Sequence, residues 1–420
     1  MVPPQAFYDL LNRTNTCLLG DMFFPDSPGH MIAELDNFLR MRHLGEVDAR
    51  RNYLAIMPKG VLGIPEIIAA TYPAVFNSTS GIQIMTDGDG ELCKLAADIQ
   101  MLRPELSVGV GLSHFRGSLR DEACRKMARL AHLPGWPQRL TWVISQEMLA
   151  ERTLQYFRRR WESQDYCPWI DIPELSPELR DLLGGKTDKL ALIHIRSNAR
   201  GGGSAANAGT QTDPSRLIPT LGYLNDLGYT IVKIGREPYP SEWAPFFVIN
   251  YSGSSLLNYR NDLLLLKAAK FVMVNASGFG NLPDILGTPM VFYGGWHIGF
   301  PPLGPKCVLL PSLMRSKACG RFLKFIEQLQ FFRSLPEYWE EGNCMSFPVD
   351  KYDERPPEAD EILASVQEAI ALGQSSTPRS KEQERFIDLD RKKYFAHVQS
   401  RVSQQFLERF PEALMPGFVV

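Results

Sequence analysis

The sequence lacks the features of several specialised classes of protein. Its seven cysteines are scattered, odd in number and without metal-type pairing, which argues against a disulfide frame and fits reduced thiols. No stretch reaches the roughly 18 apolar residues that span a bilayer. The N-terminus shows neither the basic start nor the apolar run of a signal peptide. We therefore expect a cytoplasmic protein, with association at the inner face of a membrane as an open alternative.

Neither sign of charge dominates. The chain has 45 Lys and Arg against 47 Asp and Glu, a net charge of -2. This balance provides no general attraction to nucleic acid, and we expect no such partner. The 420 residues, 44% apolar and 22% charged, exceed what one hydrophobic core usually supports, so two domains are expected.

Common catalytic signatures are also missing. There is no Walker-type Gly-Lys-Ser/Thr and no dinucleotide glycine fingerprint after the strand expected at 53–57, which disfavours P-loop kinases and NAD enzymes. There is no Gly-x-Ser-x-Gly elbow and no cluster of His and Cys ligands. We expect neither a cofactor nor a bound metal.

Strands that alternate with helices are what the sequence does contain. In the first half, a helix at 28–45 precedes strands at 53–57, 81–85, 107–112 and 140–145 and helices at 64–72, 92–102 and 146–161. A proline-rich break at 167–189 separates an N-terminal domain, 1–170, from a C-terminal domain, 186–375. Both are predicted to be Rossmann-like α/β domains with a parallel, doubly wound sheet.

The second half repeats the alternation. Strands are predicted at 190–196, 229–235, 246–251, 271–275, 290–295 and 308–313, and helices at 214–227, 260–269, 281–286, 321–332 and 358–372. The last segment, 376–420, is predicted to be one long helix, from 381 to about 410, that packs across both domains.

The stretch 190–213 is the strongest candidate for a binding site. Its strand ends on His194 and Arg196, and a glycine-rich loop follows at once. Open α/β sheets bind ligands beyond the carboxyl ends of their strands, and the fork of donors on an arginine suits a phosphate group.

Two further strand ends should lie at the same edge. One carries Lys233, Gly235 and Arg236; the other carries Asn275, Ser277 and Gly278, before a short helix whose N–H groups could receive a pyrophosphate. Asp284 follows within reach of a ribose hydroxyl. Each signal alone also fits an ordinary ion pair or turn, but their convergence favours a phosphate site.

The first half offers candidates for acid–base chemistry. His30 and Glu34 are one turn apart and share a helix face. The alternative interpretation is a surface histidine and a solvated glutamate. Asp87 and Asp89 follow the strand at 81–85, where a local turn is an equally adequate explanation.

Several segments together resemble a family of bacterial glycosyltransferases associated with gene clusters for surface polysaccharides. They are PGHMIAELDNFLR, IHIRSNARGGGS, PSRLIPTLGYLNDLGYTIVKIG, NASGFGNLPDILGTPMV and SQQFLERFPEAL. The pair His194 and Arg196 is also similar to the His-x-Arg donor motif of fucosyltransferases, whose arginine contacts the β-phosphate of GDP-fucose. Those enzymes often carry an aspartate soon afterwards, where this chain has Ser197, Asn198 and Ala199, so GDP-fucose is not carried over as the donor.

The resemblance implies a GT-B architecture, with two facing Rossmann-like domains, the donor in the second and the acceptor in the first. It implies a metal-independent, inverting transferase of the hexosyltransferase type, acting on a nucleotide-diphosphate sugar and on a glycan, lipid-linked or protein acceptor. Glu34 is the first choice as catalytic base, with His30 as partner or substitute and Asp87 in reserve. A nucleotide-sugar 2-epimerase of the same fold, or a noncatalytic glycan- or nucleotide-binding component of a polysaccharide assembly complex, remains an alternative.

Overall fold

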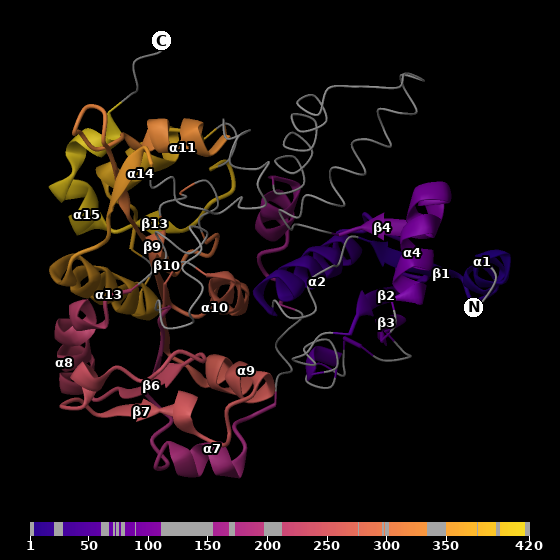
Figure 1. Cartoon of the computed structure of the whole chain (residues 1–420), viewed down its shortest axis with the longest axis horizontal. Helices are drawn as coiled ribbons and strands as arrows, with labels where there is room; N and C mark the ends of the chain where they lie inside the picture. The colour runs from indigo at the N-terminus through magenta and orange to yellow at the C-terminus, as the bar shows by residue number, and fades with distance from the viewer. Residues whose placement is uncertain are drawn as a thin grey trace. The chain divides into compact units, whose positions relative to one another are not determined.

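The computed structural model divides the chain into two compact units, Met1–Pro173 and Glu174–Val420 (Figure 1). The structure describes residues 4–20, 28–59, 67–69, 72, 75–76, 80–88, 90–110, 154–167, 173–196, 212–275, 277–295, 298, 302–333, 350–375, 377–391 and 395–415. The strand predicted at 140–145, Asp89 and the glycine-rich loop at 197–211 lie outside these residues. Among the residues described, none of the helices combines the length and apolar character needed to cross a bilayer.

Unit 1 is built on a four-stranded parallel sheet in the order β3-β2-β1-β4. Its elements are α1 (Pro4–Arg13), β1 (Thr16–Gly20), α2 (Pro28–His43), β2 (Asn52–Pro58), β3 (Ile82–Asp87), α4 (Glu91–Leu102), the 3-10 turn η1 (Pro104–Leu106) and β4 (Ser107–Gly109), and residues 154–162 are also helical. The helices predicted at 28–45 and 92–102 and three strands are confirmed.

Both faces of this sheet are covered, because alternate residues of a strand point to opposite sides. On one face, Leu18 and Ile56 pack into a core formed with α1 and α4. On the other, Tyr53 of β2 meets Phe38 of α2 edge-to-face, with ring centroids 4.8 Å apart. This explains why every residue of α2 from 31 to 41 is buried.

Helix α2 carries buried polar side chains that fasten it to the helix at 154–162. Nε of Arg40 lies 2.8 Å from Oδ2 of Asp36, and Nη1 of Arg40 donates to Oγ of Ser163 at 2.8 Å. Arg159 donates to Oδ1 of Asn37 at 2.9 Å and to Oε2 of Glu46 at 2.6 Å. Arg159 is therefore part of a buried network.

Unit 2 contains the larger sheet, whose order is β13-β10-β9-β8-β5-β6-β7 with parallel pairs throughout. Its strands are β5 (Leu190–His194), β6 (Thr230–Ile234), β7 (Val248–Asn250), β8 (Phe271–Asn275), β9 (Met290–Gly295), β10 (Cys307–Pro311) and β13 (Arg401–Val402), and β11 (Leu313–Ser316) pairs with β12 (Tyr352–Arg355) in a separate antiparallel ribbon. The helices are α7 (Pro177–Leu182), α8 (Ile218–Asp226), α9 (Tyr259–Ala268), α10 (Asn281–Leu286), α11 (Phe325–Arg333), α13 (Ala359–Gln374), α14 (Lys381–Asp388) and α15 (Gln404–Arg409), with 3-10 turns η4 (Pro214–Leu217), η5 (Ser241–Trp243), η6 (Tyr251–Gly253), η7 (Gly278–Gly280) and η8 (Pro411–Leu414).

Helices cover this sheet from both sides. Helix α13 packs against α8, β9 and β10, whereas α9 packs against β5 and α10, and Figure 1 shows the two pairs on opposite faces. Strands β8 and β10 are buried along their whole length, as expected for parallel strands covered twice. The predicted fold class, two α/β units with parallel sheets, is confirmed.

The prediction of a single long C-terminal helix is wrong. The segment forms two short helices, α14 and α15, with β13 between them. Phe386 and Phe395 stack on each other at 4.9 Å, and Phe386 and Phe406 both pack on Phe325 of α11. Breaking the helix lets these rings share one cluster and lets Arg401–Val402 pair with β10. Packing of this segment across both domains stays a prediction, and its described contacts include α11, α13, β10 and Arg355 of β12.

Candidate functional site

The strand order of unit 2 reverses at β5. From β5 the chain passes to β6 and β7 on one side, and it returns as β8, β9 and β10 on the other. Connections that leave two neighbouring strands in opposite directions open a crevice at their carboxyl ends, where ligands of α/β proteins bind. Arg196 follows β5 and Ser277 follows β8, so these two of the predicted donor residues lie at the carboxyl ends of the strands between which the order reverses.

The imidazole of His194 joins three strand ends. It stacks on Phe279 of η7, with centroids 4.8 Å apart and planes inclined by 8°. Gly235, after β6, also lies against this ring, because a Cβ there would stand 2.9 Å from Cδ2 of His194. Gly235 also has φ of +82°, a conformation that favours glycine. The predicted convergence of the ends of β5, β6 and β8 is therefore present.

Arg196 is partly buried, and its carbonyl accepts a hydrogen bond from the N–H of Thr212 at 2.9 Å. The chain thus leaves the sheet edge at Arg196 and comes back beside it at Thr212. Arg236, after Gly235, has an exposed side chain. Among the described residues, Arg196 and Arg236 are cationic side chains that follow the ends of β5 and β6.

Lys233 has a different role from the predicted one. Its side chain is fully buried, and its ammonium group donates to the hydroxyl of Ser252 at 2.9 Å and to the carbonyl of Glu237. These bonds fasten β6 to the segments that follow it. Because the ammonium group already forms hydrogen bonds inside the fold, we do not assign Lys233 to a phosphate.

The turn after β8 is packed closely on the sheet. Asn275 is 1% exposed, and Ser277 precedes η7 without capping it through its side chain. A Cβ at Gly280 would stand 2.6 Å from the ring of Phe292, so only glycine lets η7 approach β9 this closely. The N–H groups of Ser277 and Gly278 lie at the start of this turn, as the sequence predicted.

Asp284 is occupied by the protein itself. Its carboxylate accepts hydrogen bonds from the N–H of Gly304 at 2.7 Å, from the N–H of Leu303 at 3.2 Å and from the thiol of Cys307 at 3.3 Å. The side chain is 5% exposed. These contacts hold the segment before β10, and we do not carry the predicted ribose contact forward.

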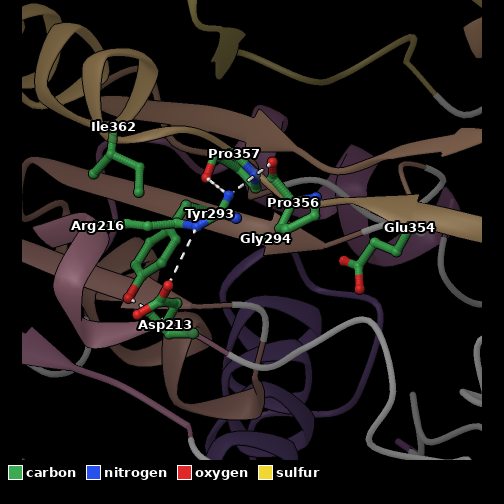
Figure 2. Close-up of a pocket in the computed structure, with 9 residues that line it drawn as sticks. Asp213, Arg216, Tyr293, Gly294, Glu354, Pro356, Pro357 and Ile362 are labelled. Carbon is green, nitrogen blue, oxygen red and sulfur yellow. Dashed lines mark hydrogen bonds and ion pairs between the residues drawn. The ribbon is translucent and has the colours of Figure 1, made fainter.

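A pocket of about 360 Å³ lies at the same edge of the sheet, beside the end of β9 (Figure 2). Its lining comes from three segments of the chain, before α8, at the end of β9, and from β12 to α13. It consists of Thr212, Asp213, Arg216, Tyr293, Gly294, Glu354, Pro356, Pro357 and Ile362. Thr212 joins the pocket to the crevice, since its N–H bonds to Arg196 and its hydroxyl lies 3.3 Å from Oη of Tyr293.

The charged groups of this pocket were not predicted. Arg216 donates to the carbonyl of Pro357 at 2.8 Å and forms longer ion pairs with Asp213 at 3.7 Å and Glu358 at 3.4 Å. Burial raises the pKa of the Glu354 carboxyl, while the Ser312 hydroxyl and the charge of Arg216 act in the opposite direction. The sequence signal was an acidic residue just before two prolines, in a stretch for which we expected no strand.

In unit 1, Glu34 and His30 both lie on α2, as predicted. Glu34 is 1% exposed, which contradicts the alternative interpretation of a solvated glutamate. The side chain of His30 is outside the description. Asp87 ends β3, is 6% exposed, and accepts a hydrogen bond from the N–H of Cys93 at 2.8 Å. That bond satisfies a free N–H in the first turn of α4, which supports the local explanation for this residue.

Among the residues described, no group of three or more His, Cys, Asp or Glu side chains is placed so that it could hold a metal ion. No protein-family model matches the chain, and no curated protein is detectably similar to it.

Solved structures give limited similarity. ADP-heptose lipopolysaccharide heptosyltransferase II of E. coli aligns with 86% of this chain and 99% of its own, at 12% identity and a TM-score of 0.44. A glycosyl transferase family 9 protein of Veillonella parvula aligns with 85% of this chain and 97% of its own, at 11% identity and a TM-score of 0.38. UDP-GlcNAc 2-epimerase of Neisseria meningitidis covers 86% and 98%, at 8% identity and a TM-score of 0.32. At these values the similarities assign neither a family nor an activity to the chain.

Proposed function

We propose that this chain is a glycosyltransferase that moves a sugar from a nucleoside-diphosphate sugar to a hydroxyl acceptor in surface glycan synthesis. Unit 2 would hold the donor and unit 1 the acceptor, in a GT-B arrangement. The observation that carries the proposal is the convergence of Arg196, His194, Gly235 and the turn at Ser277 where the strand order of unit 2 reverses.

The diphosphate would lie between Arg196 and the N–H groups of Ser277 and Gly278, with Arg236 beside it. An arginine and fixed N–H groups in a partly buried crevice stabilise the charge that develops on a leaving diphosphate. This set of groups supports metal-independent chemistry. Asn275, buried at the base of the turn, would hold the turn in place.

The acceptor hydroxyl would lose its proton to Glu34 in an inverting displacement. The support is position: α2 follows β1, and the strand order of unit 1 reverses between β1 and β4. His30, one turn earlier, would assist or replace Glu34. Asp87 stays in reserve, because it already accepts a backbone bond.

Calorimetric titration with ADP, UDP, GDP and CDP tests the donor site. At least one of these nucleotides should bind the wild-type protein. The Arg196→Ala variant should bind the same nucleotide about 10 to 100 times more weakly, since a charge-assisted hydrogen bond contributes about 1.5–3 kcal/mol. Arg385→Ala removes the same charge from the exposed face of α14 and should bind normally. Equal affinity in the wild-type and Arg196→Ala proteins would discard the assignment of this arginine.

Incubation with the sugar nucleotide alone separates the rival functions. A 2-epimerase converts the donor into a new sugar nucleotide without an acceptor, whereas a transferase gives slow hydrolysis or no product. A noncatalytic binding component binds the nucleotide but turns over no acceptor, whether glycan, lipid-linked sugar or protein. Sedimentation with lipid vesicles tests the peripheral membrane association separately.

A further inference from the structure

The pocket beside β9 is joined to the proposed diphosphate crevice but differs from it in chemistry. Thr212 forms part of the wall of both, through its bonds to Arg196 and Tyr293. Strand β9 neighbours β8, so the pocket lies one strand away from the reversal of strand order. A ligand whose diphosphate lies at Arg196 can therefore extend one end into this pocket.

The charges of the pocket exclude phosphate. Figure 2 shows Glu354 on one side of the pocket and Asp213 and Arg216 on the other. The guanidinium of Arg216 is balanced by Asp213 and Glu358 and is held by the carbonyl of Pro357. Two carboxyl groups thus face the space together with a cation that is already paired, and a second phosphate would meet repulsion.

The lining also disfavours a nucleobase. Bases are commonly held by stacking on exposed aromatic faces. The aromatic residue among those that line this pocket, Tyr293, is 2% exposed and is taken up by its contact with Thr212. The remaining lining includes two carboxyl groups, the Thr212 hydroxyl, the paired guanidinium of Arg216 and the apolar surfaces of two prolines and Ile362, which match the hydroxyl groups and the C–H faces of a sugar.

The size fits one sugar residue. A volume of about 360 Å³ is near the lower end of the range for small-molecule pockets. An oligosaccharide would not fit inside it. Glu354 is half-buried, so its carboxyl group gains from sugar hydroxyl groups that replace the water it has lost.

We propose that this pocket is the subsite for the sugar of the donor, with Glu354 and Asp213 accepting hydrogen bonds from its hydroxyl groups. This inference depends on the proposed function, since it assigns the sugar that Arg196 presents by its diphosphate. Glu354 then determines which sugar is accepted, and Arg196 determines that a diphosphate is bound at all.

The test compares Glu354→Gln with Asp353→Asn, a neighbour on β12 whose exposed carboxylate pairs with Lys317 at 3.5 Å. Calorimetry measures the affinity for ADP, UDP and GDP and for ADP-glucose, UDP-glucose and GDP-mannose. Glu354→Gln should leave the affinity for nucleoside diphosphate unchanged and weaken binding of the sugar nucleotide about tenfold. Asp353→Asn should change neither. Unchanged nucleotide binding also shows that the variant is folded.

Equal effects of Glu354→Gln on nucleotide and sugar nucleotide, or no effect on either, would overturn the subsite. Failure of the wild-type protein to bind any nucleoside diphosphate is a different result, because it removes the proposed function. In that case, saturation-transfer NMR with free glucose, galactose and mannose tests the pocket directly. A signal that Glu354→Gln abolishes supports the sugar subsite, and no signal for the wild-type protein rejects it.

Discussion

Gly235 lies so close to the Cδ2–Nε2 side of the His194 imidazole that an added Cβ would come within 2.9 Å of Cδ2. The same ring stacks on Phe279. A side chain at Gly235 would therefore push the ring and disturb this stacking. Any substitution at Gly235 should be transmitted to the end of β5, where Arg196 follows.

Gly235→Ala should weaken nucleotide binding about tenfold or more by displacing His194 and the neighbouring arginine. The matched control is Gly228→Ala, which has φ of +74° but no atom within 4 Å of its added Cβ. Both variants carry the strain of a positive φ, about 1 kcal/mol. The temperature of thermal unfolding should fall in both variants, whereas calorimetry should show a loss of nucleotide affinity in Gly235→Ala alone. Equal affinities in the two variants would remove His194 from the site.

Glu34→Gln should lower the rate of sugar transfer by about two to four orders of magnitude, the usual contribution of a general base. Nucleotide affinity should stay unchanged, because the donor binds unit 2. Asp87→Asn is the comparison, since an asparagine oxygen can still accept the hydrogen bond from Cys93. It should keep turnover if Asp87 serves α4 alone. Full activity of purified Glu34→Gln would exclude Glu34 as the base.

Asp262 should make stability depend on pH. Burial raises the pKa of this carboxyl from 3.8 to about 7, with the Tyr251 hydroxyl and the charge of Arg236 acting in the opposite direction. Its Oδ1 has no hydrogen-bond partner among the described residues. Between these two values the folded protein keeps a proton that the unfolded chain releases, so stability falls as the pH rises.

Urea unfolding at pH 5 and pH 8 measures this effect. Between pH 5 and pH 8 the free energy of unfolding of the wild-type protein should fall by on the order of 1 kcal/mol or more. Asp262→Asn should not show this decrease. Asp226→Asn, on an exposed part of α8, should retain the full loss. The same pH dependence in wild type and Asp262→Asn would show that this carboxyl is ionised in the folded protein.

Asp284→Ala should destabilise unit 2 by about 1–3 kcal/mol, because the N–H groups of Leu303 and Gly304 lose their acceptor inside the fold. Asp360→Ala breaks an exposed ion pair with Arg409 and should change stability by less than about 1 kcal/mol. Denaturant unfolding measures both. A tenfold loss of nucleotide affinity in Asp284→Ala, without loss of stability, would restore its predicted role at the ribose.

The sequence predicted most of the apolar, buried strands of unit 2, but it missed the buried strand β1 (Thr16–Gly20) inside the sheet of unit 1. Strands such as Phe271–Asn275, and the short helix Asn281–Leu286, lie where the pattern put them. Two-residue β13 has no pattern of its own, and it exists because β10 offers an open edge. In one continuous helix Phe386 would point roughly opposite to Phe395 and Phe406, so the three rings can share a cluster only because the helix is broken.

Site residues were predictable only as far as strand ends reveal them. His194, Gly235 and Ser277 were found because parallel strands bring their carboxyl ends together. The partners of Asp284 and Lys233 were not, since Gly304 and Ser252 lie about twenty residues downstream and reach them through the fold. Glu354 was missed because β12 belongs to a small antiparallel ribbon that supplies one wall of the pocket.

Strand β13 closes the outer edge of the large sheet with residues that come after α14. A nascent chain that has emerged from the ribosome only as far as β10 leaves the backbone of this apolar strand open on one side. The four strands of unit 1 are all made much earlier, so unit 1 can fold while unit 2 is still waiting for its last strand. This edge of β10 therefore stays unpaired until β13 has been made.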